Sequence, residues 1–116
     1  MSISIRDLLL HILEEIEFLV NESSSLSEEK FLADERAKRA FARSFEIIGE
    51  ASKNIPDAFK EEHSEIEWKE MARMRDRLIH HYFGVDYYIV WDTVEANIPK
   101  LKKQIETLIE DFKTEQ

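Results

Sequence analysis

The sequence contains no cysteine, so neither a disulfide nor a thiolate zinc site can hold this protein together. It has only two glycines and two prolines in 116 residues, which leaves little material for turns. Hydrophobic residues make up 43% of the chain and charged residues 35%. This composition favours long amphipathic helices, and we predict an all-α fold that forms one domain over residues 1–116.

Long apolar runs are also missing. None approaches the ~20 residues that cross a bilayer, and the N-terminal residues lack the basic region and apolar stretch of a signal peptide. We therefore expect a cytoplasmic protein that does not enter a membrane. The formal net charge of -9 repels a phosphate backbone at long range but leaves room for a small basic site. One such site lies between Lys69 and Tyr82, where Arg73, Arg75 and Arg77 gather.

The spacing of apolar residues predicts an antiparallel bundle of four to five main helices. The first covers residues 4 to 21, and Ser4 with Asp7 can begin it. After a cap at Ser25 or Ser27, the second runs without a break to about Asn54. Gly49 within that helix costs about 1 kcal/mol relative to alanine, a cost that close packing against another helix would offset.

Punctuating residues divide the second half of the chain. Pro56 ends the long helix, and a short helical connector follows it. Ser64 and Glu67 form a capping box for the third main helix. Gly84, which is free to take a positive φ, ends this region. Asp86 is suited to cap the fourth helix, which covers residues 86 to 97. A fifth helix, with the second proline in its first turn, covers most of the remaining residues.

The third main helix carries an arginine within its apolar face. On a helical wheel, Arg73 and Arg77 point away from the apolar stripe, whereas Arg75 falls inside it. A guanidinium that is partly removed from water needs partners for its N–H donors. Two kinds of partner remain open for Arg75: an anionic ligand, or a carboxylate of the second helix such as Glu46 or Glu50. The stripe consists of Trp68, Met71, Met74 and Leu78.

Asp76 and His80 are four residues apart and share a helix face, so the carboxylate can orient the imidazole through a hydrogen bond. The helix dipole favours a protonated histidine in the last turn, which suits acid-base catalysis near neutral pH. A histidine that only complements the dipole is the alternative. Arg75 and His80 converge only if the helix ends at or near His80. They would then supply a phosphate clamp and a proton carrier, the two needs of phosphodiester cleavage.

The other titratable groups do not suggest a metal centre. His11 and His63 are expected to be ordinary surface residues. Asp76, His80 and His81 do not have the spacing that a zinc site needs. We therefore expect no metal ion and no other cofactor.

The order Arg75, four residues, His80, one residue, Tyr82 is the R-x4-H-x-Y motif of the HEPN superfamily. With the flanking segments IIGEASKNIP, WKEMARMRDRLIHHYFGVDYYIVWDTV and IPKLKKQI, the chain resembles the HepT-like ribonuclease toxins in particular. The resemblance spans the chain from about Ile5 to Phe112. It implies a homodimeric helical bundle that cleaves RNA without a metal, with the two motifs facing each other.

The resemblance also implies residue roles and a partner. His80 would activate a ribose 2′-hydroxyl for attack on the neighbouring phosphate, giving a 2′,3′-cyclic end. Arg75 would stabilise the developing charge, and Asp76 would orient or assist. The implied partner is an antitoxin nucleotidyltransferase of the MNT type, which transfers AMP to Tyr82. An adenylate two residues from His80 would add negative charge and bulk where the substrate phosphate must lie.

Two alternatives remain open. A HEPN-like dimer with an intact motif could be a catalytically silent adaptor that binds RNA or the nucleotidyltransferase, and the negative net charge favours it slightly. A purely structural dimer would use Arg75 only as an ion-pair partner. We also predict that the apolar residues around Met71, Met74 and Leu78 lie near the dimer contact, because the arginine needs a covered cleft.

Overall fold

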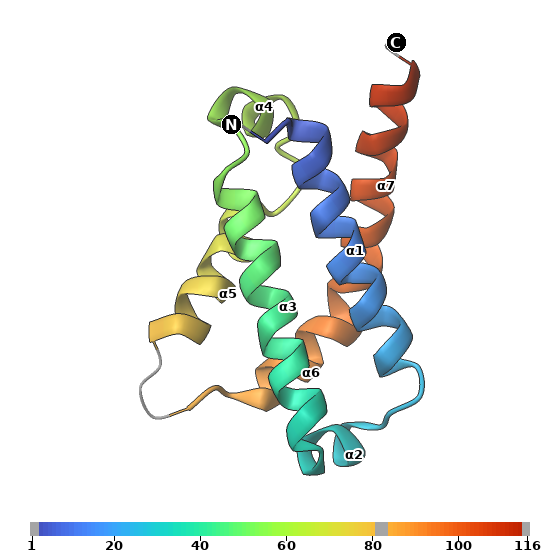
Figure 1. Cartoon of the computed structure of the whole chain (residues 1–116), viewed down its shortest axis with the longest axis vertical. Helices are drawn as coiled ribbons and strands as arrows, with labels where there is room; N and C mark the ends of the chain where they lie inside the picture. The colour runs from blue at the N-terminus through green and yellow to red at the C-terminus, as the bar shows by residue number, and fades with distance from the viewer. Residues whose placement is uncertain (1–2, 81–83, 115–116) are drawn as a thin grey trace.

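The structure is a computed structural model that describes residues 3–80 and 84–114, without the side chains of residues 79, 80, 113 and 114. Within these ranges the chain is helical and has no strand, as the composition predicted. The helices are α1 (Ile5–Ser23), α2 (Glu28–Ala33), α3 (Glu35–Lys53), α4 (Asp57–Glu62), α5 (Trp68–His80), α6 (Tyr87–Ala96) and α7 (Ile98–Thr114) (Figure 1).

The four longer helices α1, α3, α5 and α7 run up and down the long axis of a molecule of 46 × 29 × 26 Å (Figure 1). α3 packs against both α1 and α5, and α1 packs against α7. α6 crosses beneath them and contacts α2 and α7. No helix in the described ranges is long and apolar enough to cross a membrane. Fully buried side chains fill the space between the helices: Leu9, Ile12, Ile16, Leu19, Phe31, Phe41, Ile48 and Ile105.

The long second helix of the sequence prediction is wrong, because α2 and α3 are separate helices with Asp34 between them. The backbone of Asp34 is extended, and its carboxylate accepts a hydrogen bond from the N–H of Ala37 at 3.0 Å. This turn directs Phe31 into the core, where its ring centroid lies 4.7 Å from that of Phe41 and 5.2 Å from that of Trp91. An aspartate is compatible with an exposed helix position and is also a strong N-cap, so periodicity alone did not detect the break.

Most other helix boundaries follow the predicted caps. The Ser4 hydroxyl accepts a hydrogen bond from the N–H of Asp7 at 3.1 Å. Gly84 has a φ of 112°, and Asp86 caps α6. The third main helix starts later than predicted, since the carbonyl of Glu67 accepts the first helical hydrogen bond of α5. The capping box with Ser64 therefore does not mark the first turn of that helix.

Candidate functional site

Gly49 on α3 determines how closely α5 approaches. A Cβ atom at this position would overlap the Cβ of Arg75 and lie 2.9 Å from the carbonyl oxygen of Met71. Glycine is the residue type that leaves this space to the neighbouring helix. The close packing predicted for Gly49 is confirmed, and it places the stem of Arg75 directly against the backbone of α3.

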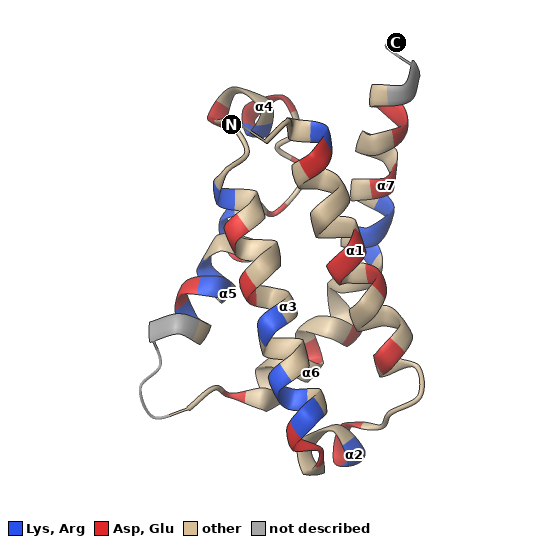
Figure 2. Ribbon diagram, viewed as in Figure 1, with Lys and Arg blue, Asp and Glu red and all other residues tan. Residues whose placement is uncertain are grey.

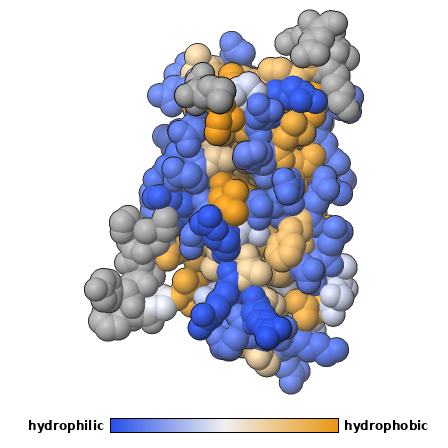
Figure 3. All heavy atoms as spheres, in the orientation of Figure 1, coloured by the Kyte–Doolittle hydropathy of each residue, from blue (hydrophilic) through white to orange (hydrophobic). Residues whose placement is uncertain are grey.

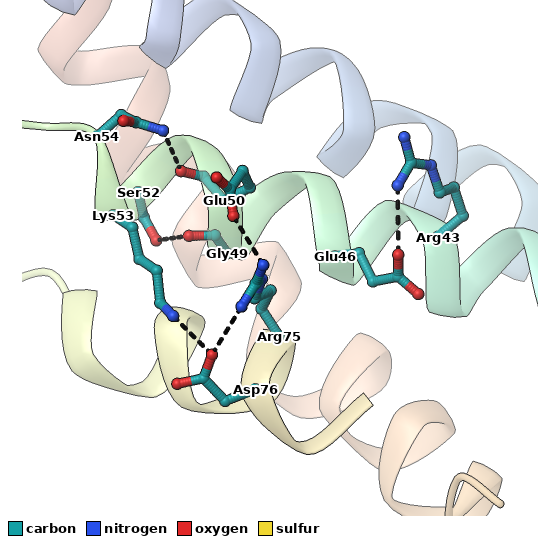
Figure 4. Close-up of polar contacts among 9 residues, drawn as sticks. All are labelled: Arg43, Glu46, Gly49, Glu50, Ser52, Lys53, Asn54, Arg75 and Asp76. Carbon is teal, nitrogen blue, oxygen red and sulfur yellow. Dashed lines mark hydrogen bonds and ion pairs between the residues drawn. The ribbon is translucent and has the colours of Figure 1, made fainter. Parts of the chain in front are cut away.

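The guanidinium of Arg75 lies between two carboxylates (Figure 4). One Nη atom is 3.2 Å from the Oε2 of Glu50 on α3, and the other donates to the Oδ1 of Asp76 at 3.1 Å. Glu46, the other partner considered from the sequence, pairs instead with Arg43 at 3.2 Å. The Arg75 side chain is 24% exposed to solvent. Two bonds do not exhaust the donors of a guanidinium, so Arg75 can hold its carboxylates and still meet a phosphate oxygen.

Lys53 also belongs to this cluster, although the sequence reasoning did not find it. Its ammonium lies 2.6 Å from the Oδ1 of Asp76, the same oxygen that Arg75 contacts. Lys53 is on α3 and Asp76 is on α5, and no sequence pattern pairs positions on two different helices. The only available signal was that Glu50 and Lys53, three residues apart, share a face of α3.

The electrostatics of the cluster indicate what Asp76 does. The hydrogen bond from Lys53, followed by that from Arg75, lowers the pKa of the Asp76 carboxyl below its ordinary value. The carboxylate is therefore ionised at neutral pH and is not suited to carry a proton. Its observed role is to hold one cation from each of two helices.

Of the remaining residues of the R-x4-H-x-Y motif, the structure describes only the backbone of His80. α5 is described as far as His80, and the predicted end of the helix at or near this residue stays a prediction, because residues 81–83 lie outside the described residues. The side chain of His80, together with His81 and Tyr82, lies outside the described residues. The hydrogen bond expected between Asp76 and His80 therefore stays a prediction. Both observed bonds of Asp76 use Oδ1, and a carboxylate can accept through either oxygen.

A groove borders the side of α5 that faces α6 and α7. It consists of two hollows, of about 290 and 330 Å³, which share Met74, Arg77 and Ile89 in their walls. Met71 and Leu78, which also line it, are each only 9% exposed, so they already belong to the core of this chain. Ile89 on α6 is 41% exposed, so the rim of the groove offers apolar surface to solvent.

The histidines outside the motif have different surroundings. His11 is exposed on α1, as expected. His63 is half-buried, with its ring centroid 4.5 Å from that of Phe59, a packing contact that the sequence did not predict. Among the side chains that the structure describes, which do not include that of His80, no group of three His, Asp or Glu is placed to bind a metal ion.

The fold and the cluster define an all-α protein whose helix α5 carries an arginine and an aspartate, held by Glu50 and Lys53 of α3. The family model described as "Ribonuclease HepT-like" matches residues 9–108 of the chain. Together with the relatives below, this match shows that the chain belongs to the HepT-like ribonuclease family.

Relatives from several organisms align along nearly their whole length. "Probable ribonuclease HepT" of Thermococcus cleftensis is 51% identical over 108 residues, which cover 93% of this chain and 98% of the relative. "Putative RNase TTE0752" of Caldanaerobacter subterraneus subsp. tengcongensis is also 51% identical, over 93% of this chain and 96% of its own. "Putative RNase MJ0127" of Methanocaldococcus jannaschii is 41% identical, over 96% of this chain and 92% of its own length. No solved structure matches the chain significantly.

Proposed function

We propose that this protein is a metal-independent endoribonuclease toxin, paired with an MNT-type nucleotidyltransferase antitoxin in a type VII-like toxin-antitoxin system. The observation that carries the proposal is the cluster at the end of α5, where Arg75 is held by Glu50 and Asp76 close to His80 in the chain. Membership of the HepT-like ribonuclease family supports it. The protein acts in the cytoplasm as one HEPN-like domain over residues 1–116.

The proposed reaction is a transesterification within the RNA backbone. His80 removes the proton of a ribose 2′-hydroxyl, and the oxygen attacks the adjacent phosphorus. The bond to the 5′-oxygen of the next nucleotide breaks, and that oxygen takes up the proton that His80 removed, so His80 returns to its neutral form. The products are a 2′,3′-cyclic phosphate and a free 5′-hydroxyl. Arg75 stabilises the charge that develops on the non-bridging oxygens, and Asp76 keeps its guanidinium in place.

We propose that a second copy of the chain covers the groove between α5 and α6. Two observations support an interface there: the rim of the groove is apolar, and Met74 is only partly buried within one chain. The sequence predicted that Met71, Met74 and Leu78 lie near the dimer contact. Because Met71 and Leu78 are buried within one chain and form the floor of the groove, we propose that the contact uses the rim instead. In the dimer the two α5 helices would bring the two motifs together.

The proposed regulation is transfer of AMP to Tyr82 by the antitoxin. The tyrosine oxygen would attack the α-phosphate of ATP, and pyrophosphate would leave. An adenylate beside His80 would then occupy the place of the scissile phosphate and repel it. Intact mass measurement of the protein, after incubation with the nucleotidyltransferase and ATP, tests this step through the added AMP and its loss in Tyr82→Phe.

Cleavage of total RNA by the purified protein in EDTA tests the nuclease. We expect new ends that carry a 2′,3′-cyclic phosphate, and we expect them to disappear in His80→Ala. The matched control is His11→Ala, which removes an exposed histidine of α1 and should cleave like the wild type. Absence of cleavage by wild type that carries no AMP on Tyr82 would overturn the proposal. It would favour the adaptor, which the net charge of -9 also favours.

A further inference from the structure

The N-terminal half of α3 carries a row of arginines that the cluster around Arg75 does not use. Arg36, Arg39 and Arg43 follow one another at spacings of three and four residues, so they share one face of the helix. Figure 2 shows basic residues along this half of α3, and Figure 3 shows strongly hydrophilic side chains on the same surface. We call these three residues the arginine row.

Two members of the arginine row, Arg36 and Arg39, have no partner among the residues that the structure describes. Within residues 3–80 and 84–114, neither an ion pair nor a hydrogen bond occupies the guanidinium of Arg36 or Arg39, and both side chains are exposed. Lys38 on the same turns shows the contrast. It bonds to Glu35 at 2.9 Å and to the carbonyl of Leu32 at 3.3 Å. Arg43 pairs with Glu46 but keeps 69% of its side-chain surface exposed.

The row is unfavourable for the helix itself. Like charges three and four residues apart repel each other along a helix face. Arg36 also lies in the first turn of α3, where the helix dipole disfavours a cation. Nothing in the packing requires these charges, since the row faces solvent. Such local conflicts with helix preference are expected where a surface serves binding.

The row is in line with the cluster around Arg75. Along α3 the same face continues through Glu46, the partner of Arg43, to Glu50 and Lys53. The last two residues hold Arg75 and Asp76. Arg43 and Lys53 are ten residues apart, about 15 Å at the rise of an α-helix. A chain of phosphates that reaches Arg75 can therefore extend along α3 to the arginine row.

We infer that the arginine row binds the backbone of a single-stranded RNA on one side of the scissile phosphate. The inference rests on the proposed function for the position of the cut, but the binding is a separate property. The net charge of -9 repels RNA at long range, but salt screens carboxylates that lie farther away than about 10 Å. Residues 35–43 themselves carry four cations and one carboxylate, so the local charge of the arginine row is positive. Arginine suits this ligand, because its planar guanidinium contacts phosphate oxygens in pairs.

The test is the affinity for a fluorescein-labelled single-stranded oligoribonucleotide, measured in His80→Ala so that the RNA stays intact. The variant is Arg36→Gln with Arg39→Gln, which leaves the pair of Arg43 with Glu46 in place. We expect the Kd to rise about tenfold in dilute salt, and the dependence of log Kd on log salt to weaken by about 0.7 for each lost phosphate contact. Lys102→Gln with Lys103→Gln removes the same charge from α7 and should change the Kd by less than about twofold.

Cleavage by the wild-type and double-variant enzymes separates the row from the catalytic cluster. We expect the double variant, with His80 intact, to show a raised KM for the oligomer and an unchanged rate on a dinucleotide, which is too short to reach the row. An equal loss of affinity in the α7 control, or a double variant that has become monomeric, would overturn the inference. If the wild type cleaves RNA and the Kd of the double variant is unchanged, RNA binding by the arginine row is overturned but the proposed nuclease activity is not. If the double substitution weakens binding but the wild type does not cleave RNA, the result supports RNA binding by the arginine row and overturns the proposed nuclease activity.

Discussion

The backbone of Gly49 on α3 lies directly against the side-chain stem of Arg75 on α5, with no room for a Cβ between them. The same stem carries the guanidinium to its two carboxylates, Glu50 and Asp76. The approach of two helices therefore sets the position of the charged group. Packing and chemistry are coupled at this point, and a change in one should appear in the other.

Gly49→Ala tests this coupling through the sign of its effect. In an exposed helix the substitution would stabilise the protein by about 1 kcal/mol, because alanine is the better helix former. Here the added methyl group meets Arg75 and the carbonyl of Met71, and we expect a loss of about 1–3 kcal/mol in the free energy of unfolding. RNA cleavage should fall as well. Urea denaturation gives the sign, and a more stable variant with full activity would contradict the coupling.

Asp76→Asn should lower stability at neutral pH and lose that effect in acid. The pKa of the Asp76 carboxyl is lowered on folding by the hydrogen bonds from Lys53 and Arg75. A carboxyl of this kind stabilises the folded protein above its unfolded pKa, and the stabilisation is lost as the pH falls through the lower folded value. We therefore expect the difference between wild type and variant to shrink below about pH 3.8.

Lys53→Gln provides the matching measurement at the same carboxylate. Removal of the hydrogen bond from Lys53, the main cause of the lowered pKa, should raise the pKa of the Asp76 carboxyl toward its ordinary value. Carbon-detected NMR titration of the side-chain carboxyl measures this directly. An unchanged titration curve would show that the ion pair between α3 and α5 does not form in solution.

Arg75→Leu distinguishes a structural role from a role in RNA cleavage. If Arg75 serves only as an ion-pair partner, the apolar replacement should preserve or raise stability without affecting any activity. The proposed function predicts a folded dimer that no longer cuts RNA. Arg73→Leu is the control, because this neighbouring arginine is exposed and, in the described part of the chain, pairs with Glu70 alone, at 2.8 Å. Retention of cleavage in Arg75→Leu would remove Arg75 from the mechanism.

Ile89→Glu should separate the proposed dimer into monomers. The side chain is 41% exposed at the rim of the groove beside α5, and a buried charge without a partner would oppose association. Phe18→Glu, at a position on α1 that is 37% exposed, is the matched control and should remain dimeric. Sedimentation velocity at micromolar concentration measures both. A monomeric wild type would contradict the dimer itself.

Local rules predicted much of the helical framework. The cap at Ser4, the positive φ of Gly84 and the cap at Asp86 are all present, because each depends on residues within one turn of each other. Asp34 shows the limit of such rules. Its carboxylate caps α3, and the break it creates is stabilised by Phe31, which is buried against rings from α3 and α6. Those contacts cannot be derived from periodicity.

The residues of the candidate site were also predicted from the sequence only in part. The spacing in the sequence identified Arg75 and Asp76 on one helix and Gly49 as a point of close packing. It left the choice between Glu46 and Glu50 open. It also did not detect Lys53, because a distance between two helices depends on how they pack.

The sequence by itself determined the all-α class, most of the caps and the neighbouring positions of Arg75 and Asp76 on one helix, since these depend on composition and on neighbours along the chain. Only the tertiary structure decided that Glu50 holds Arg75, that Lys53 shares an oxygen of Asp76 and that the second predicted helix is broken. The physical reason is that ion pairs and ring contacts between helices need atoms within a few ångströms. That proximity is set by the packing of the whole core.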